Sequence, residues 1–226
     1  MNRNGDRGDR IMGGIFNYDS PFSRIMGRVV DIFYASVLWI IGCIPVVTIG
    51  TSTTALFTVA RRTLKLDRGY VWQTYKDTFK AEFKQTTIVW LLQAALFLVL
   101  AFGRMIARVF LEQGSPLGFL YYVYHYAILY EMVWVVYTCA YASRFKMGIK
   151  GTMLNSAILS LKYFPVSVLF LIMIIVSIRI VMDMPFFGFI LPAGLAWIFQ
   201  FFLEKIFRRI MTFEDRTRVE EDERGW

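Results

Sequence analysis

Four long apolar runs constrain the fold of this chain more than any other feature of its sequence. They are Thr86 to Phe102, Leu117 to Ala142, Phe164 to Val181, and Pro185 to Leu203. A helix of roughly 18 to 20 apolar residues crosses a hydrocarbon core about 30 Å thick, because it rises about 1.5 Å per residue. Each run approaches or exceeds that length, so we expect four transmembrane helices.

The composition of the whole chain agrees with a membrane protein. Of its 226 residues, 57% are hydrophobic and only 19% are charged, whereas soluble domains carry about 25% charged residues. A mean hydropathy of +0.49 is difficult to keep in water. These values exclude a disordered chain, and they predict an all-α fold, a polytopic transmembrane helical bundle.

A fifth apolar stretch, residues 21–60, is too long for one ordinary span and is interrupted at Pro45. It forms either one span and a surface helix or a broken helical hairpin, so the bundle has five or six membrane segments. Cytoplasmic loops of membrane proteins are enriched in Lys and Arg. If the chain folds back at Pro45, 22 of the 25 basic residues lie on one side, whereas five spans divide them 17 against 8. The broken hairpin is therefore favoured, with both termini in the cytoplasm.

We divide the chain, as a single transmembrane domain, into five parts. They are a polar N-terminal arm (1–20), the broken hairpin (21–60), a cytoplasmic amphipathic segment (61–85), four transmembrane helices (86–207) and a flexible C-terminal tail (208–226). Aromatic residues from Trp72 to Phe83 recur every three or four residues, which predicts a helix on the inner membrane surface. The net charge of +8 therefore reflects topology, and we expect the lipid bilayer, not nucleic acid, as a partner.

The segment 46–60 follows the break at Pro45 and is short and rich in Thr and Ser, which predicts a half-buried or re-entrant helix. Its non-helical backbone must be covered by protein or face a water-filled cavity, because lipid cannot satisfy hydrogen bonds. Pro45 and Gly50 form the predicted hinge. The candidate ligand-binding hydroxyls are those of Thr48, Thr51, Ser52 and Thr54. They either bind a polar ligand such as a sugar near a helix N-terminus, or they satisfy the broken backbone and its caps.

Glu131 is a carboxylate near the middle of the apolar run 117–142, where an unpaired charge costs about 2.5 kcal/mol or more. It must therefore face the protein interior. Tyr124, Glu131 and Thr138 recur every seven residues and share one face of the predicted helix. Glu131 is either a proton-linked or substrate-binding group in a central cavity, or a buried acid that hydrogen-bonds to hydroxyls of a neighbouring helix.

Several segments of the chain resemble the YesL-like family of bacterial integral membrane proteins, whose biochemical function is unknown. They are Gly14 to Phe33, Leu38 to Leu56 with its "PVVTIG" motif, the basic and aromatic loop Asp67 to Thr87, and Met153 to Phe170. The resemblance implies a multi-pass protein of the bacterial cytoplasmic membrane, commonly found beside carbohydrate-uptake ABC transport components. It implies no catalytic residue.

The sequence therefore predicts two alternative functions. The first is an accessory or regulatory component of a carbohydrate ABC uptake system, in contact with its permease or ATPase subunits. The alternative is a small stand-alone transporter or channel with a polar intramembrane site around Glu131 and residues 48–54. A homo-oligomer is compatible with either. We expect no enzyme, cofactor or metal site, because the chain has one histidine and two separate cysteines within apolar runs and no phosphate-binding loop.

Overall fold

The computed structural model describes residues 21–65 and 70–210, and the secondary structure in those ranges is helical, without strands. The helices are α2 (Pro21–Cys43), α3 (Ile49–Val59), α4 (Val71–Glu112), α5 (Leu120–Ala142), α6 (Ile149–Lys162), α7 (Phe164–Asp183) and α8 (Leu191–Ile210). Short helical turns join them: η1 (Val46–Thr48), η2 (Ala60–Lys65), η3 (Pro116–Phe119) and η4 (Pro185–Phe189). The predicted arm 1–20 and the residues 211–226 of the predicted tail lie outside the described residues.

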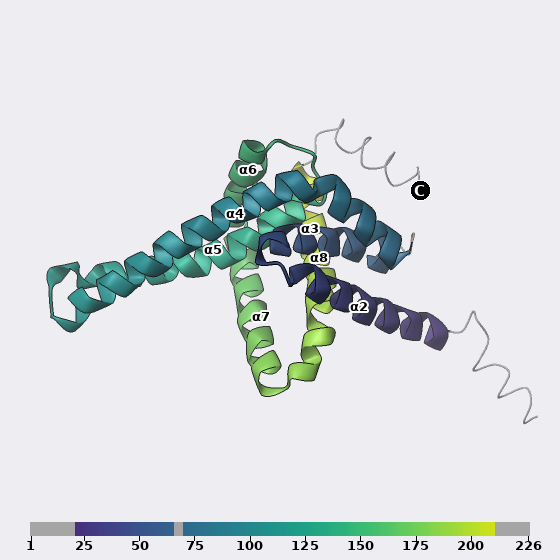
Figure 1. Ribbon diagram of the computed structural model, residues 1–226, viewed down its shortest axis with the longest axis horizontal. Helices are drawn as coiled ribbons and strands as arrows, with labels where there is room; N and C mark the ends of the chain where they lie inside the picture. The colour runs from purple at the N-terminus through teal and green to yellow at the C-terminus, as the bar shows by residue number, and fades with distance from the viewer. Residues whose placement is uncertain (1–20, 66–69, 211–226) are drawn as a thin grey trace, which may run out of the picture.

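The short helix α3 lies at the centre of the bundle. It contacts α2, α4, α5 and α8. Two hairpins extend from this centre in different directions, one formed by α4 and α5 and the other by α7 and α8 (Figure 1). The core contains aromatic and aliphatic side chains from α3, α5, α7 and α8, including Phe57, Tyr137, Phe170 and Leu203.

Three of the described helices are long and apolar enough to cross a membrane. They are α2 from Met26 to Cys43, α4 and α7. The all-α fold predicted from the sequence is confirmed. The other two predicted spans correspond to α5 and to η4 with α8, and the total of five or six membrane segments stays a prediction.

The chain folds back at Pro45, where the sequence predicts a break. Helix α2 ends at Cys43, and Pro45 has an extended backbone with φ −77° and ψ 116°. Helix α3 then runs for 11 residues, or about 16 Å, which is about half of a hydrocarbon core. Nearly all of α3 is buried. The surrounding helices therefore cover this segment, as the sequence predicts for a non-helical backbone that lipid cannot hydrogen-bond.

The predicted boundary between a surface segment ending at residue 85 and a span beginning at residue 86 lies within a single helix, and it stays a prediction. Helix α4 runs through both without interruption, for 42 residues. The composition changes from basic to apolar along this helix, but residues 71–102 contain neither Gly nor Pro to break it. At the other end of the predicted segment, η2 continues directly from α3, and Arg61 is buried. Residues 61–64 therefore belong to the bundle and not to a surface loop.

A further helix, α6, lies within the segment 143–162, between the apolar runs 117–142 and 164–181 that the sequence predicts as transmembrane helices. The side chains of Thr152, Ser156 and Ser160 are buried on one face of α6, and this face packs against α5. Residues 86–207 therefore contain, besides the helices of the four predicted spans, a more polar helix that packs against α5.

Candidate functional site

Hydroxyl groups of α3 form hydrogen bonds with two neighbouring helices, α2 and α4. Thr51 Oγ1 lies 2.8 Å from Thr86 Oγ1 and 3.0 Å from Thr87 Oγ1, both on α4. Ser52 Oγ donates to the carbonyl oxygen of Trp39 in α2 at 3.1 Å and lies 2.6 Å from Tyr75 Oη. These bonds connect α3 to α2 on one side and to α4 on the other.

The remaining hydroxyls of this segment bond to nearby backbone. Thr48 Oγ1 donates to the carbonyl oxygens of Gly42 and Pro45, at 2.7 and 2.8 Å, and so closes the turn between α2 and α3. Thr53, Thr54 and Thr58 each donate to the carbonyl four residues earlier in the helix. We call these six side chains, Thr48, Thr51, Ser52, Thr53, Thr54 and Thr58, the α3 hydroxyl cluster.

Each hydroxyl of the cluster has a partner within the protein. This arrangement supports the interpretation that they satisfy the broken backbone and join the helices, because hydroxyls at membrane depth need such partners. A ligand would have to replace bonds that already exist. Ligand binding by Thr48, Thr51, Ser52 or Thr54 stays a prediction.

Gly50, the second predicted hinge residue, lies within the first turn of α3. A Cβ atom added there would lie 2.4 Å from Cβ of Trp90 and 3.3 Å from the backbone oxygen of Thr86. Gly50 therefore allows α3 and α4 to approach closely, and the change of chain direction occurs before it, at Pro45. This contact explains why the Thr51 hydroxyl can reach α4.

Glu131 is 2% exposed, and its Oε1 accepts no hydrogen bond from any described residue. The contacts of Tyr124 and Thr138, seven residues before and after it on α5, show which neighbouring helix its face meets. Thr138 Oγ1 accepts a hydrogen bond from Gln93 Nε2 of α4 at 3.0 Å. The ring of Tyr124 packs against Gly103, which also lies on α4. A Cβ atom added to Gly103 would lie 2.7 Å from a carbon of that ring. The face that Glu131 shares with these two residues therefore meets α4, a neighbour that the heptad spacing alone does not identify.

A second polar group joins α5 to α6. Ser156 Oγ lies 2.9 Å from Thr138 Oγ1 and accepts a hydrogen bond from Trp134 Nε1 at 3.0 Å. One turn along, Tyr130 Oη lies 2.9 Å from Ser160 Oγ. Gln93 and Ser156 are not among the predicted site residues. Gln93 nevertheless shows the same sequence signal as Glu131, because it is a polar side chain inside an apolar run.

The structure brings part of the predicted site together and leaves part of it separate. Thr54, Thr86, Gln93 and Thr138 line one cavity of about 10 Å³ between α3, α4 and α5, which is close to the smallest space that holds a water molecule. The cavity therefore places Thr138 beside the α3 hydroxyl cluster. Glu131 does not line it.

Residues 32–104 match a sequence family described as "Protein of unknown function, DUF624", which is the YesL-like family. The matched part runs from α2 through most of α4 and includes the α3 hydroxyl cluster, but not Glu131. No curated protein and no solved structure matches the chain.

Proposed function

We propose that this chain is a multi-pass protein of the bacterial cytoplasmic membrane, with both termini in the cytoplasm, that acts as an accessory or regulatory component of a carbohydrate ABC uptake system. The observation that carries the proposal is the α3 hydroxyl cluster. Its hydroxyls are bonded inside the protein, so the centre of the bundle serves as a scaffold. The resemblance of the segment 38–56 to the YesL-like family supports the transport context.

The hairpin of α4 and α5 supports a role in binding another membrane protein. Large apolar side chains such as Leu98, Val99 and Phe102 are exposed along α4, where the hairpin extends away from the bundle (Figure 1). Such a surface suits the transmembrane helices of a permease, because helices in lipid associate through close packing.

Co-purification in mild detergent from the native host tests this proposal. We expect permease or ATPase subunits to accompany the wild-type chain, and the Val99→Trp variant on α4 to lose them. Val176→Trp is the matched control, because Val176 is an exposed valine on another apolar helix, α7. A protein that purifies alone, or only with copies of itself, would contradict the accessory role.

A stand-alone transporter or channel is the second candidate, and the buried Oε1 of Glu131 favours it. A carboxylate without a hydrogen-bond donor at this depth costs free energy, and such groups commonly bind protons or substrates. Solute flux into liposomes, measured for the wild type and Glu131→Gln, tests this function. Glu112→Gln is the control, because Glu112 is exposed at the end of α4 and pairs with Arg108. Flux that Glu131→Gln alone abolishes would establish transport.

A further inference from the structure

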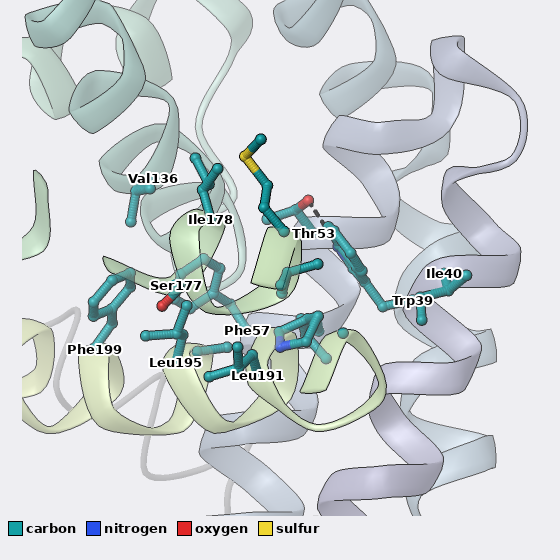
Figure 2. Close-up of a pocket in the computed structure, with 16 residues that line it drawn as sticks. Trp39, Ile40, Thr53, Phe57, Val136, Ser177, Ile178, Leu191, Leu195 and Phe199 are labelled. Atoms are coloured by element: carbon teal, nitrogen blue, oxygen red, sulfur yellow. Dashed lines mark hydrogen bonds between the residues drawn. The ribbon is translucent and has the colours of Figure 1, made fainter. Parts of the chain in front are cut away.

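A cavity of about 520 Å³ lies between α2, α3, α7 and α8. Apolar side chains from these helices project into it, among them Phe57, Leu195 and Phe199 (Figure 2). On the α7 side it is lined by Ile178 and Met182, which are both exposed. The cavity therefore opens to the surface of the bundle.

The few polar atoms at this cavity are already bonded. Trp39 Nε1 donates to Thr53 Oγ1 at 3.1 Å, and Thr53 Oγ1 in turn donates to the carbonyl oxygen of Ile49 at 2.8 Å. Ser177 Oγ donates to the carbonyl oxygen of Met173 at 2.7 Å. A polar or charged ligand would lose its hydration here without gaining hydrogen bonds.

Two of the helices that border the cavity, α2 and α7, are long and apolar enough to cross a bilayer. When two such helices span a bilayer, an opening between them faces hydrocarbon. Water does not favour an apolar space, and an empty space of this size would forfeit dispersion contacts along its walls. Hydrocarbon from the surrounding lipid is the material that fits these conditions.

The volume of the cavity also limits its occupant. A helix with its side chains has a diameter of about 10 to 12 Å, so 520 Å³ accommodates roughly one turn of a partner helix. A flexible chain is narrower and can follow the walls. The volume lies within the range of about 300 to 1,000 Å³ that is typical of small-molecule sites.

We propose that this cavity is a lipid site that binds one acyl chain of a membrane phospholipid between α2 and α7. The inference goes beyond the proposed function, because it concerns a separate face of the bundle. The bound chain fills the space between the α7–α8 hairpin and α3, and it stabilises their packing through mass action.

Two glycines provide a matched pair of variants. Gly188 lines the cavity, and a Cβ atom added to it would lie 3.7 Å from Val181 Cγ1, an ordinary contact distance. A larger side chain there can enter the space. An added Cβ at Gly194 on α8 would have nothing within 4 Å, and Gly194 does not line the cavity. We therefore compare Gly188→Phe with Gly194→Phe.

The experiment uses the full-length protein in vesicles of phosphatidylcholine brominated near the middle of its acyl chains, with tryptophan fluorescence as the readout. The signal of Trp39 is the difference between each protein and its Trp39→Phe counterpart. We expect Trp39 to be quenched in the wild type and in Gly194→Phe, and to lose this quenching in Gly188→Phe. Native mass spectrometry after detergent washing should show one phospholipid fewer per chain in Gly188→Phe.

Two results would overturn the proposal. One is the absence of Trp39 quenching in the wild type, a result that does not depend on either glycine variant. The other is equal quenching and equal lipid retention in Gly188→Phe and Gly194→Phe. Retention of a second copy of the chain in place of a lipid would likewise assign the cavity to a protein contact and contradict the lipid site.

Discussion

Glu131 and all members of the α3 hydroxyl cluster except the half-buried Thr53 are buried polar groups, but only the cluster has its hydrogen bonds satisfied. The Ser52 hydroxyl lies between a carbonyl of α2 and Tyr75 of α4, whereas the Oε1 of Glu131 accepts no bond from a described residue. Buried polar groups with partners hold helices together, and those without partners lower stability. The cluster therefore stabilises the packing of the helices, whereas burying Glu131 lowers the stability of the bundle.

The largest effect should come from Gly50, on which the close approach of α3 and α4 depends. Gly50→Leu places atoms against Cβ of Trp90 and the backbone of Thr86, and we expect a loss of about 3 kcal/mol in the free energy of unfolding. Titration of the purified protein from mild detergent into sodium dodecyl sulfate measures this loss. Gly27→Leu is the control, because nothing lies within 4 Å of an added Cβ there. Equal stability of the two variants would show that α3 is not tightly packed.

Removing a hydroxyl from the cluster should have the next largest effect. Ser52→Ala leaves the buried Tyr75 hydroxyl without its partner at 2.6 Å, and we expect a loss of about 2 kcal/mol. The Ser52→Ala/Tyr75→Phe double variant should lose less than the sum of the single variants, since the two groups interact directly. Ser177→Ala is the control, because this hydroxyl bonds only within its own helix. Strict additivity would mean that the Ser52–Tyr75 bond contributes nothing.

Glu131→Leu should change stability in the opposite direction. The substitution removes a buried oxygen that accepts no hydrogen bond from the described residues, so we expect a gain of about 1 kcal/mol. The same detergent titration measures it. Glu131→Gln keeps the size of the side chain and tests whether volume alone accounts for the change. A loss of stability as large as that of Ser52→Ala would indicate a structural role for Glu131.

The smallest effect should come from Gln93, which joins α4 to Thr138 through one hydrogen bond. Gln93→Leu replaces the amide with an apolar side chain. We expect the free energy of unfolding to fall by about 0.6 kcal/mol, the average for hydrogen bonds between membrane helices. Thr138→Val removes the other partner and completes a double-variant cycle. A coupling of more than about 2 kcal/mol would show that this bond belongs to a larger cooperative network.

The sequence predicts the helical membrane fold and the break at Pro45 well, because both depend on local features. Apolar length defines a span, and proline cannot continue a helix. The sequence does not indicate that residues 71–112 form one continuous helix, α4. Its change from basic to apolar side chains indicates where the environment changes, while the backbone continues through residue 85 without interruption.

Helix α6 was missed because its small polar residues resemble those of a loop. Thr152, Ser156 and Ser160 recur every four residues, and this spacing is the signal that could have identified a helix face packed on α5. For the candidate site, too, local sequence patterns predict only part of the arrangement. The heptad of Glu131 predicts a face turned to the protein interior, and Glu131 is buried, but the sequence does not indicate which helix that face meets. The partners of the α3 hydroxyls, such as Thr86 and Thr87 on α4, likewise depend on tertiary contacts.

The sign of the stability change separates the two kinds of buried polar group most directly. Thr51→Val and Glu131→Leu should be compared in one detergent titration, because each replaces a buried polar side chain with an apolar one of similar size. We predict that Thr51→Val lowers the free energy of unfolding, since Thr51 bonds to Thr86 and Thr87, and that Glu131→Leu raises it. Changes of the same sign in both variants would contradict the distinction between them.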